Sequence, residues 1–225
     1  MSGKMDRLMA SASKSREVSE RSGPFGMVVL ASGNGSNLQA IIDRLHGRDG
    51  IEVLAVGSDR PGAFALERAE AAGIKTGTFP GGDYEDRPTR DAAMADWIEG
   101  LGADLVVLAG YMQLLSPGFV DRFRGKIVNV HPSLLPSFPG LDAIGQAIEA
   151  GVEETGVTVH FVDEGTDTGP VILQRAVVVE PGMDREALEE AIHAVEHELF
   201  PEAIGMIAAG RVRIAADDDR RVLLD

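Results

Sequence analysis

The chain of 225 residues contains no cysteine. This absence excludes a disulfide framework and any zinc or iron–sulfur site held by thiolates. Basic residues are also scarce, since 21 Lys and Arg face 36 Asp and Glu, for a formal net charge of −15. Non-specific binding of nucleic acid needs clustered Lys and Arg, so the acidic balance argues against that function. It does not prevent a local site from binding an anionic small molecule.

Long apolar runs are missing as well, because none approaches the roughly 18 residues that a membrane-spanning helix requires. The first 25 residues are polar and lack the apolar core of a signal peptide. We therefore expect a flexible tail over 1–25, in which Met5 and Met9 are alternative starts, and a cytoplasmic protein. Apolar residues make up 44% and charged residues 25%, as in a soluble globular domain. We assign 26–214 to that single domain and 215–225 to an acidic C-terminal tail.

Short apolar, β-branched runs alternate with segments of helical spacing along the domain. This alternation predicts βαβ units and an α/β fold with a doubly wound, mostly parallel sheet. Two long runs at 156–163 and 171–180 predict an antiparallel hairpin added to that sheet, and a long closing helix is expected over 185–209, with Pro201 able to kink it. The other strands are predicted at 26–32, 51–59, 74–79, 103–110 and 126–131, and the other helices at 37–45, 61–73 (with Pro61 at its start), 89–99 and 141–150.

Three polar stretches follow predicted strands, namely GNGSN at 33–37, GYMQ at 110–113 and NVHPS at 129–133. Ligands of open α/β sheets bind at the carboxyl ends of strands, where the strand order reverses. The three stretches therefore mark the expected site.

The stretch ASGNGSNLQ, at 31–39, has the pattern of strand, glycine-rich turn and helix. Gly33 and Gly35 allow backbone N–H groups to approach a ligand, and the helix N-terminus favours an anion. No Gly-Lys-Ser/Thr follows, and Leu38 replaces the third glycine of a dinucleotide motif. A single phosphomonoester fits better than a dinucleotide. The alternative is a plain turn in which Ser36 or Asn37 caps the helix.

Asn129 and His131 are two residues apart on a predicted strand, so both side chains project to one face. An asparagine can donate to a developing oxyanion, and a histidine can move a proton near neutral pH. The segment DEGTDTGP offers an orienting carboxylate, for which Asp167 is the candidate. No nucleophile motif or metal-binding spacing accompanies them. The mechanism that remains is direct transfer between two bound substrates. The alternatives are that His131 is a structural histidine and that the acidic segment is a solvated turn. His160 is interpreted as a structural residue.

Five stretches in this order resemble the folate-dependent formyltransferases: GNGSNLQAIID, LAGYMQLLSP, IVNVHPSLLPSFPG, TVHFVDEGTDTGPVILQ and AVEHELFP. The resemblance covers about residues 26–214 and implies the Rossmann-like fold of that family. The first and last stretches resemble the branch that acts on glycinamide ribonucleotide. The implied reaction moves the formyl group of the co-substrate 10-formyltetrahydrofolate to the amine of 5-phosphoribosyl glycinamide, without a metal, as a step of purine biosynthesis. Members of the family are often dimers, so a homodimer is implied too.

The resemblance also implies roles for individual residues. Asn129, His131 and Asp167 would be catalytic, and Gly35, Ser36, Asn37 and Glu196 would bind the ribonucleotide. Asn129 would hold the formyl oxygen, protonated His131 would stabilise the tetrahedral intermediate, and Asp167 would orient the histidine or a water. The folate would lie along Arg87, Met112, Gln113, Leu114, Leu115, Asn129, Val162, Asp163, Glu164, Gly165, Thr166 and Asp167.

Gln113 departs from the family pattern, which often has Arg or Lys there. Three other functions stay open. A formylfolate hydrolase would share the three catalytic residues but would not need a phosphate loop. A methionyl-tRNA formyltransferase is disfavoured by the acidic charge and by the lack of a tRNA-binding domain. A binding module without catalysis would have no reason to place Asn, His and Asp at this spacing.

Overall fold

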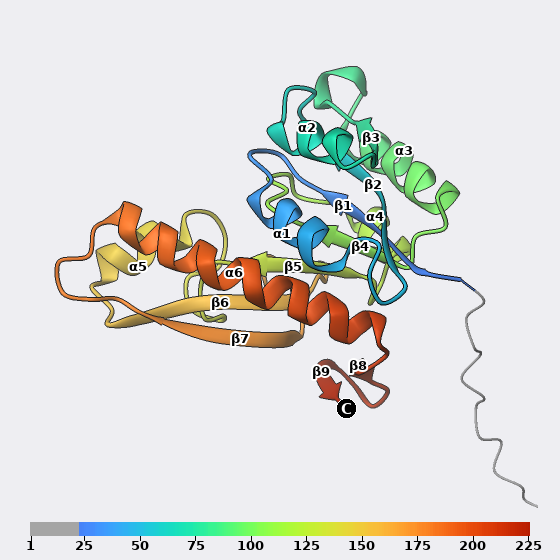
Figure 1. Ribbon diagram of the computed structural model, residues 1–225. Coiled ribbons are helices and arrows are strands. Elements are labelled where there is room, and N and C mark those ends of the chain that lie inside the picture. The colour runs from blue at the N-terminus through green and yellow to red at the C-terminus, as the bar shows by residue number, and fades with distance from the viewer. Residues whose placement is uncertain (1–22) are drawn as a thin grey trace, which may run out of the picture.

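The computed structural model describes residues 23–225. The expected tail at 1–25 therefore lies almost wholly outside the described residues, and Phe25 already begins the first strand. Figure 1 shows a central sheet flanked by helices, with the C-terminus on a small separate hairpin. The strands are β1 (Phe25–Leu30), β2 (Ile51–Ser58), β3 (Lys75–Thr78), β4 (Leu105–Leu108), β5 (Ile127–His131), β6 (Glu154–Phe161), β7 (Val171–Val178), β8 (Val212–Ala215) and β9 (Asp218–Leu224).

Seven strands form the main sheet in the order β3-β2-β1-β4-β5-β6-β7. Strands β1 to β5 are parallel to one another, whereas β6 is antiparallel to both β5 and β7. The chain moves outward from β1 to β3 and then crosses back to β4 on the other side of β1. The switch point thus lies between β1 and β4, which is where doubly wound sheets bind their ligands. The predicted mostly parallel sheet with an antiparallel hairpin is confirmed.

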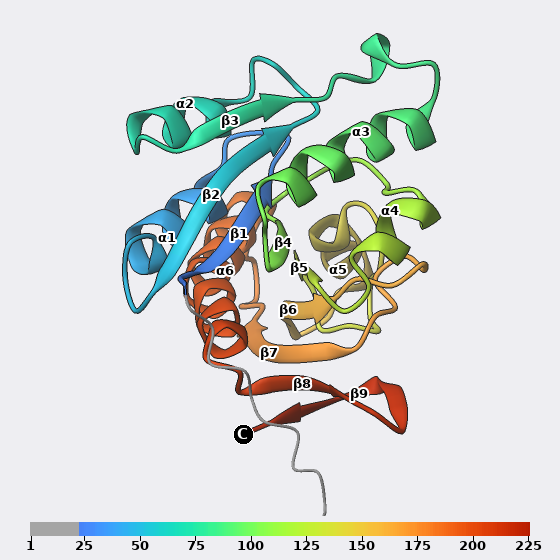
Figure 2. The ribbon, with the colours of Figure 1, turned by 90° about the vertical axis from the view of Figure 1, so that its right-hand side faces the viewer.

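Helices cover both faces of the sheet, as Figure 2 shows. Helices α1, α2 and α6 pack on one face around Leu38, Leu66 and Ile192, while α3 and α4 pack on the other around Met94 and Phe119. Strands β1 and β4 are almost wholly buried because apolar helix faces lie on both sides of them. The helices are α1 (Ser36–Leu45), α2 (Phe64–Ala71), α3 (Arg87–Gly100), α4 (Pro117–Arg122), α5 (Ala143–Ala150) and α6 (Arg185–Ala208), with a 3-10 turn at Gly81–Asp83.

Most boundaries lie within one or two residues of the expectation, helix α4 was not predicted, and two differences are larger. Helix α2 begins at Phe64 and not at Pro61, because Ala63 N–H first closes a turn onto the carbonyl of Arg60. The segment 215–225 was expected to be a separate tail, but 218–224 forms β9, which pairs with β8. Val222 of β9 packs against the core, so apolar burial and backbone pairing order this end of the chain despite its charges.

Helix α6 spans Arg185–Ala208 and continues through Pro201. Its start is capped by Asp184, whose carboxylate accepts a hydrogen bond from Ala187 N–H. None of the helices in the described part of the chain combines the length and apolar character needed to cross a membrane.

Candidate active site

Strand β5 carries Asn129 and His131 to the carboxyl edge of the sheet. This strand lies between β4 and β6. Asn129 lies opposite Leu108 of β4 on one side and opposite His160 of β6 on the other. Asn129 is half-buried, and His131 is only 5% exposed. Since alternate residues of a strand project to one face, the two side chains are presented to the same side.

Asp167 reaches the same point from the segment between β6 and β7. Its backbone is left-handed, with φ of 53°, which turns the side chain inward. One carboxylate oxygen, Oδ2, lies 3.4 Å from Nδ1 of His131 and accepts a hydrogen bond from Gly140 N–H at 2.8 Å. The structure thus brings together the three residues that the sequence selected, while their catalytic role stays a prediction.

The ring of His131 has an acceptor at each nitrogen. Nε2 lies 2.8 Å from the carbonyl oxygen of Phe138. A carbonyl oxygen only accepts, so Nε2 carries a hydrogen and donates it. With the Asp167 carboxylate at Nδ1, the imidazole is oriented from both sides. A histidine held in this way is suited to general acid–base work because its orientation is fixed by its neighbours.

His160, which we interpreted from the sequence as a structural residue, also belongs to this cluster. It is 2% exposed. Its Nδ1 lies 2.8 Å from the carbonyl of Phe161, so Nδ1 carries the hydrogen and Nε2 is left as an acceptor. The amide Nδ2 of Asn129 lies 3.2 Å from that Nε2 and donates to it. Burial lowers the pKa of His160, which favours this neutral form.

His160 therefore fixes the orientation of the Asn129 amide. One N–H of the amide is committed to the imidazole, and the second remains for a ligand. Nε2 of His160 is also 3.7 Å from Oδ1 of Asp167, so the two histidines flank one carboxylate. No sequence pattern signalled this contact, because it depends on the pairing of β5 with β6, which places residues 129 and 160 directly opposite each other.

Two adjoining cavities open beside the cluster, with volumes of about 280 and 690 Å³. Asn129 and Asp167 line both of them. The remaining residues expected to contact folate also line this cleft: Arg87, Gln113, Leu114, Leu115, Val162, Asp163, Glu164, Gly165 and Thr166 in one or both cavities, and Met112 in the larger. Exposed apolar side chains such as Met112 (59%) and Leu114 (66%) give the cleft the apolar walls that small-molecule sites favour.

Gln113, where the family often has a cation, is held by its neighbours. Its side-chain oxygen accepts from Arg90 at 3.3 Å, and its amide donates to Asp59 at 3.0 Å. Arg90 is itself paired with Asp91 in a buried ion pair. Gln113 therefore bridges a cation and a carboxylate, and among the predicted folate residues Arg87 is the one that brings a full positive charge.

The glycine-rich stretch lies at the start of α1. Gly35 is the N-cap of the helix, with φ of 75°, and no side chain caps this helix end. The alternative of a turn capped by Ser36 or Asn37 is therefore wrong. The first intrahelical hydrogen bond runs from Gln39 N to the carbonyl of Gly35. The N–H groups of Ser36, Asn37 and Leu38 precede that bond and are the donors that a helix N-terminus offers to an anion.

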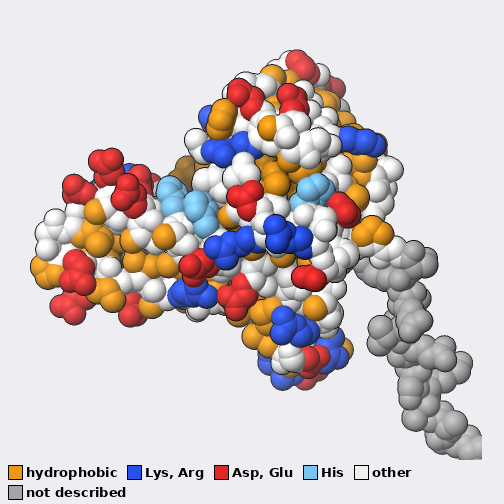
Figure 3. Space-filling model, viewed as in Figure 1, with side chains coloured by type: hydrophobic (Ala, Val, Ile, Leu, Met, Phe, Trp, Pro, Cys, Tyr) orange, Lys and Arg blue, Asp and Glu red, His pale blue; other side chains and the backbone are white. Residues whose placement is uncertain are grey.

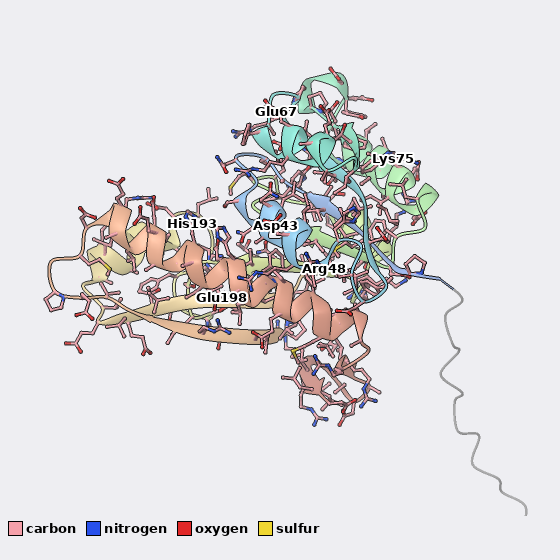
Figure 4. The ribbon with its side chains drawn as sticks, in the orientation of Figure 1. Asp43, Arg48, Glu67, Lys75, His193 and Glu198 are labelled. Atoms are coloured by element: carbon pink, nitrogen blue, oxygen red, sulfur yellow. The ribbon has the colours of Figure 1, made fainter. Side chains whose placement is uncertain are left out.

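Asn37 connects this loop to helix α6. Its Nδ2 donates to Oε2 of Glu196 at 2.8 Å, across 159 residues of sequence. Both residues are buried, and this burial raises the pKa of the Glu196 carboxyl. The hydrogen bond from Asn37 and the charges of His193 and His131 oppose that rise. Histidine side chains are visible on the surface along α6 in Figure 3, and Figure 4 labels His193 there.

The four residues predicted to bind the ribonucleotide, Gly35, Ser36, Asn37 and Glu196, thus form one group outside the cleft that Asn129 and Asp167 line. The resemblance had grouped these four residues from the sequence, and the packing of α6 against α1 brings the two halves of the group together.

Comparison with known proteins agrees with this arrangement. The family model described as formyl transferase matches residues 26–204. The chain belongs to the formyl transferase family. It is 44% identical over 178 residues to the phosphoribosylglycinamide formyltransferase of Bacillus subtilis, covering 78% of this chain and 91% of that protein.

Similarity extends to longer proteins and to solved structures. The chain is 45% identical over 194 residues to the trifunctional purine biosynthetic protein adenosine-3 of Drosophila melanogaster, which is 85% of this chain but only 14% of that protein's length. It superposes on glycinamide ribonucleotide transformylase 1 of Symbiobacterium toebii with a TM-score of 0.85 and 46% identity, covering 91% of this chain and 95% of that one.

Proposed function

We propose that this protein transfers the formyl group of 10-formyltetrahydrofolate to the amine of 5-phosphoribosyl glycinamide, as a step of purine biosynthesis. The observation that carries the proposal is that Asn129, His131 and Asp167 lie together in the wall of the cleft that Met112 and Leu114 also line. A second polar group, the pair of Asn37 and Glu196, lies outside that cleft. Two substrates bound in these regions would meet at the catalytic cluster. The names of the relatives support the same reaction.

The reaction follows from the chemistry of the three side chains. The substrate amine attacks the formyl carbon, and a new C–N bond forms while the formyl oxygen gains negative charge. The free N–H of Asn129 donates to this oxyanion. The oxyanion then re-forms the carbonyl as the bond from carbon to the folate nitrogen breaks; protonated His131 supplies the proton that this nitrogen takes up, and the proton that the amine loses restores the protonated form of His131. Asp167 orients the imidazole and offsets its positive charge.

Each binding region suits one substrate. The folate ring system would lie in the apolar cleft, with Arg87 as the cation for the carboxylates of its glutamate tail. The phosphate of the ribonucleotide would bind the N–H groups at the start of α1. The carboxylate of Glu196, already fixed by Asn37, would accept hydrogen bonds from the ribose hydroxyls or the glycinamide amine.

The test is a spectrophotometric assay of folate deformylation by the purified protein, with and without 5-phosphoribosyl glycinamide. We expect turnover only when the ribonucleotide is present, because its amine is the acceptor. Equal turnover in its absence would identify a hydrolase and overturn the proposal. No turnover while the ribonucleotide still binds would identify a binding module instead.

A further inference from the structure

The proposed phosphate loop, residues 33–37, has no Lys or Arg of its own. Backbone N–H groups and the helix N-terminus carry only partial positive charge. The affinity for a dianionic phosphate therefore depends on how well these donors are aligned and on any cation beside them. One arginine from the neighbouring helix α2 provides both.

Arg68 holds the loop with a forked set of hydrogen bonds. Its Nε donates to the backbone carbonyl of Asn34 at 2.9 Å, and its second terminal nitrogen donates to Oδ1 of the same residue at 3.0 Å. The other terminal nitrogen donates to the side-chain oxygen of Gln39 at 3.1 Å. Gln39 in turn donates to Asp43 at 2.9 Å, which keeps its oxygen toward the arginine. The planar guanidinium thus joins the loop to the first turn of α1.

The position of Arg68 is itself fixed by α2. Its guanidinium carbon lies 4.7 Å from the ring centroid of Phe64, one turn earlier on the same helix. Phe64 is 45% exposed, so the guanidinium lies over an aromatic ring at the surface of the molecule. A second contact between α2 and the loop is the hydrogen bond from Ala65 N–H to the carbonyl of Gly33, at 3.1 Å. Helix α2 therefore supports the loop at two successive points.

We propose that Arg68 is a positioning residue for the phosphate of the ribonucleotide. It engages the carbonyl and the side chain of Asn34, so the loop keeps the conformation in which the N–H groups after Gly35 are free for a ligand. It also places a full positive charge next to a loop that has no Lys or Arg of its own. The inference rests on the proposed function, because it assumes that the loop binds the substrate phosphate.

The experiment compares Arg68→Gln with Arg48→Gln in steady-state kinetics of the full chain. Figure 4 labels Arg48, which lies beyond the C-terminal end of α1 and is exposed, so this control removes the same charge away from the loop. We expect Arg68→Gln to raise the KM for the ribonucleotide about tenfold, which corresponds to about 1.4 kcal/mol of lost binding free energy. The KM for folate and kcat should stay near the wild-type values. Competitive inhibition by inorganic phosphate against the ribonucleotide should weaken by a similar factor.

Arg68→Lys separates charge from geometry, because lysine keeps the charge but cannot span both acceptors of Asn34. We expect its KM for the ribonucleotide to lie between those of wild type and Arg68→Gln. The inference is overturned if Arg68→Gln behaves like Arg48→Gln, or if it raises both KM values together as a general loss of structure would. Asn34→Ala, which removes one acceptor and leaves the charge, serves as the second variant if Arg68→Gln unfolds, and a wild-type KM there would equally count against the inference. Absence of ribonucleotide-dependent turnover in the wild type would instead defeat the proposed function.

Discussion

At the scale of single residues, the chemistry of the site depends on which ring nitrogen of each histidine carries a hydrogen. Two buried histidines flank Asp167, but their environments assign them different tasks. His131 faces an acceptor at each nitrogen, whereas His160 gives its hydrogen to Phe161 and keeps Nε2 as an acceptor for Asn129. The partner of the second ring nitrogen therefore distinguishes the two histidines. The carboxylate of Asp167 allows His131 to carry a second hydrogen, whereas the amide N–H of Asn129 requires a bare nitrogen on His160.

This difference predicts the behaviour of His160 variants. His160→Phe keeps the ring volume but removes the acceptor for Asn129, so kcat should fall, by less than the about 10²–10³-fold expected for losing the Asn129 donor itself. His160→Gln can place a carbonyl oxygen near the position of Nε2 and should recover much of the rate. Steady-state kinetics of both variants, with thermal melting to confirm folding, checks this expectation.

The double variant His160→Phe with Asn129→Ala provides the control. If His160 acts through the amide, its loss should have little further effect once Asn129 is alanine. Multiplicative losses in the double variant would instead show that His160 acts independently of Asn129.

Glu196 leads to a prediction about pH. Burial raises its pKa above the ordinary value of 4.5, so the native state prefers the neutral carboxyl more than the unfolded state does. The stability that this preference contributes is complete below pH 4.5 and is lost as the pH rises through the folded-state pKa. Glu196→Gln does not titrate, and its amide oxygen can still accept from Asn37. Its melting temperature should therefore exceed that of the wild type by more at pH 8 than at pH 4, while the KM for the ribonucleotide rises.

Glu190→Gln is the matched control, because Glu190 is an exposed carboxylate on the same helix. Its effect on the melting temperature should be small at both pH values. An equal stabilisation by Glu196→Gln at pH 4 and pH 8 would contradict the account of this buried carboxyl.

At the scale of elements, the strands and most helices could be predicted from hydrophobic periodicity, because each must present an apolar face to the sheet. What could not be predicted depends on local hydrogen bonding or on tertiary contacts. Helix α2 begins three residues after Pro61 because a turn forms first. The acidic segment 215–225 contributes β9 because Val222 finds apolar partners that the sequence does not reveal.

The junction of β1 and α1 requires a glycine for two reasons. Gly35 has φ of 75°, and a Cβ at this position would lie 2.7 Å from Cβ of Ala65. Gly47 has a similar φ of 71° but open space around it. In Gly47→Ala only the left-handed backbone should cost stability, about 1–2 kcal/mol. Gly35→Ala adds the overlap with α2, for which overpacking typically costs a further ~1–3 kcal/mol.

Urea unfolding of the two variants measures this difference directly. The KM for the ribonucleotide should rise in Gly35→Ala and remain unchanged in Gly47→Ala. Equal losses of stability in both variants would mean that the close approach of α2 to the loop does not constrain this position.

At the scale of the whole molecule, the fold assembles a site from segments far apart in the sequence. Strand spacing predicted that Asn129 and His131 share a face, the segment DEGTDTGP offered Asp167 as the orienting carboxylate, and the resemblance to a family supplied Glu196. The contacts from Arg68 to Asn34, and from His160 to Asn129, could not be found in this way. Each depends on which elements are neighbours, and a single sequence read by periodicity does not encode that pairing explicitly. The order β3-β2-β1-β4-β5-β6-β7 supplies it.

The central claim is that formyl transfer occurs at the cluster of Asn129, His131 and Asp167. Single-turnover measurement of formyl transfer by His131→Ala, with both substrates bound beforehand, tests this claim most directly. We expect the transfer rate to fall by about 10²–10⁴-fold, the usual contribution of a general acid or base. The affinities for folate and ribonucleotide should stay close to those of the wild type, because His131 is only one of many residues that line the folate cleft. A wild-type rate of transfer in this variant would contradict the account.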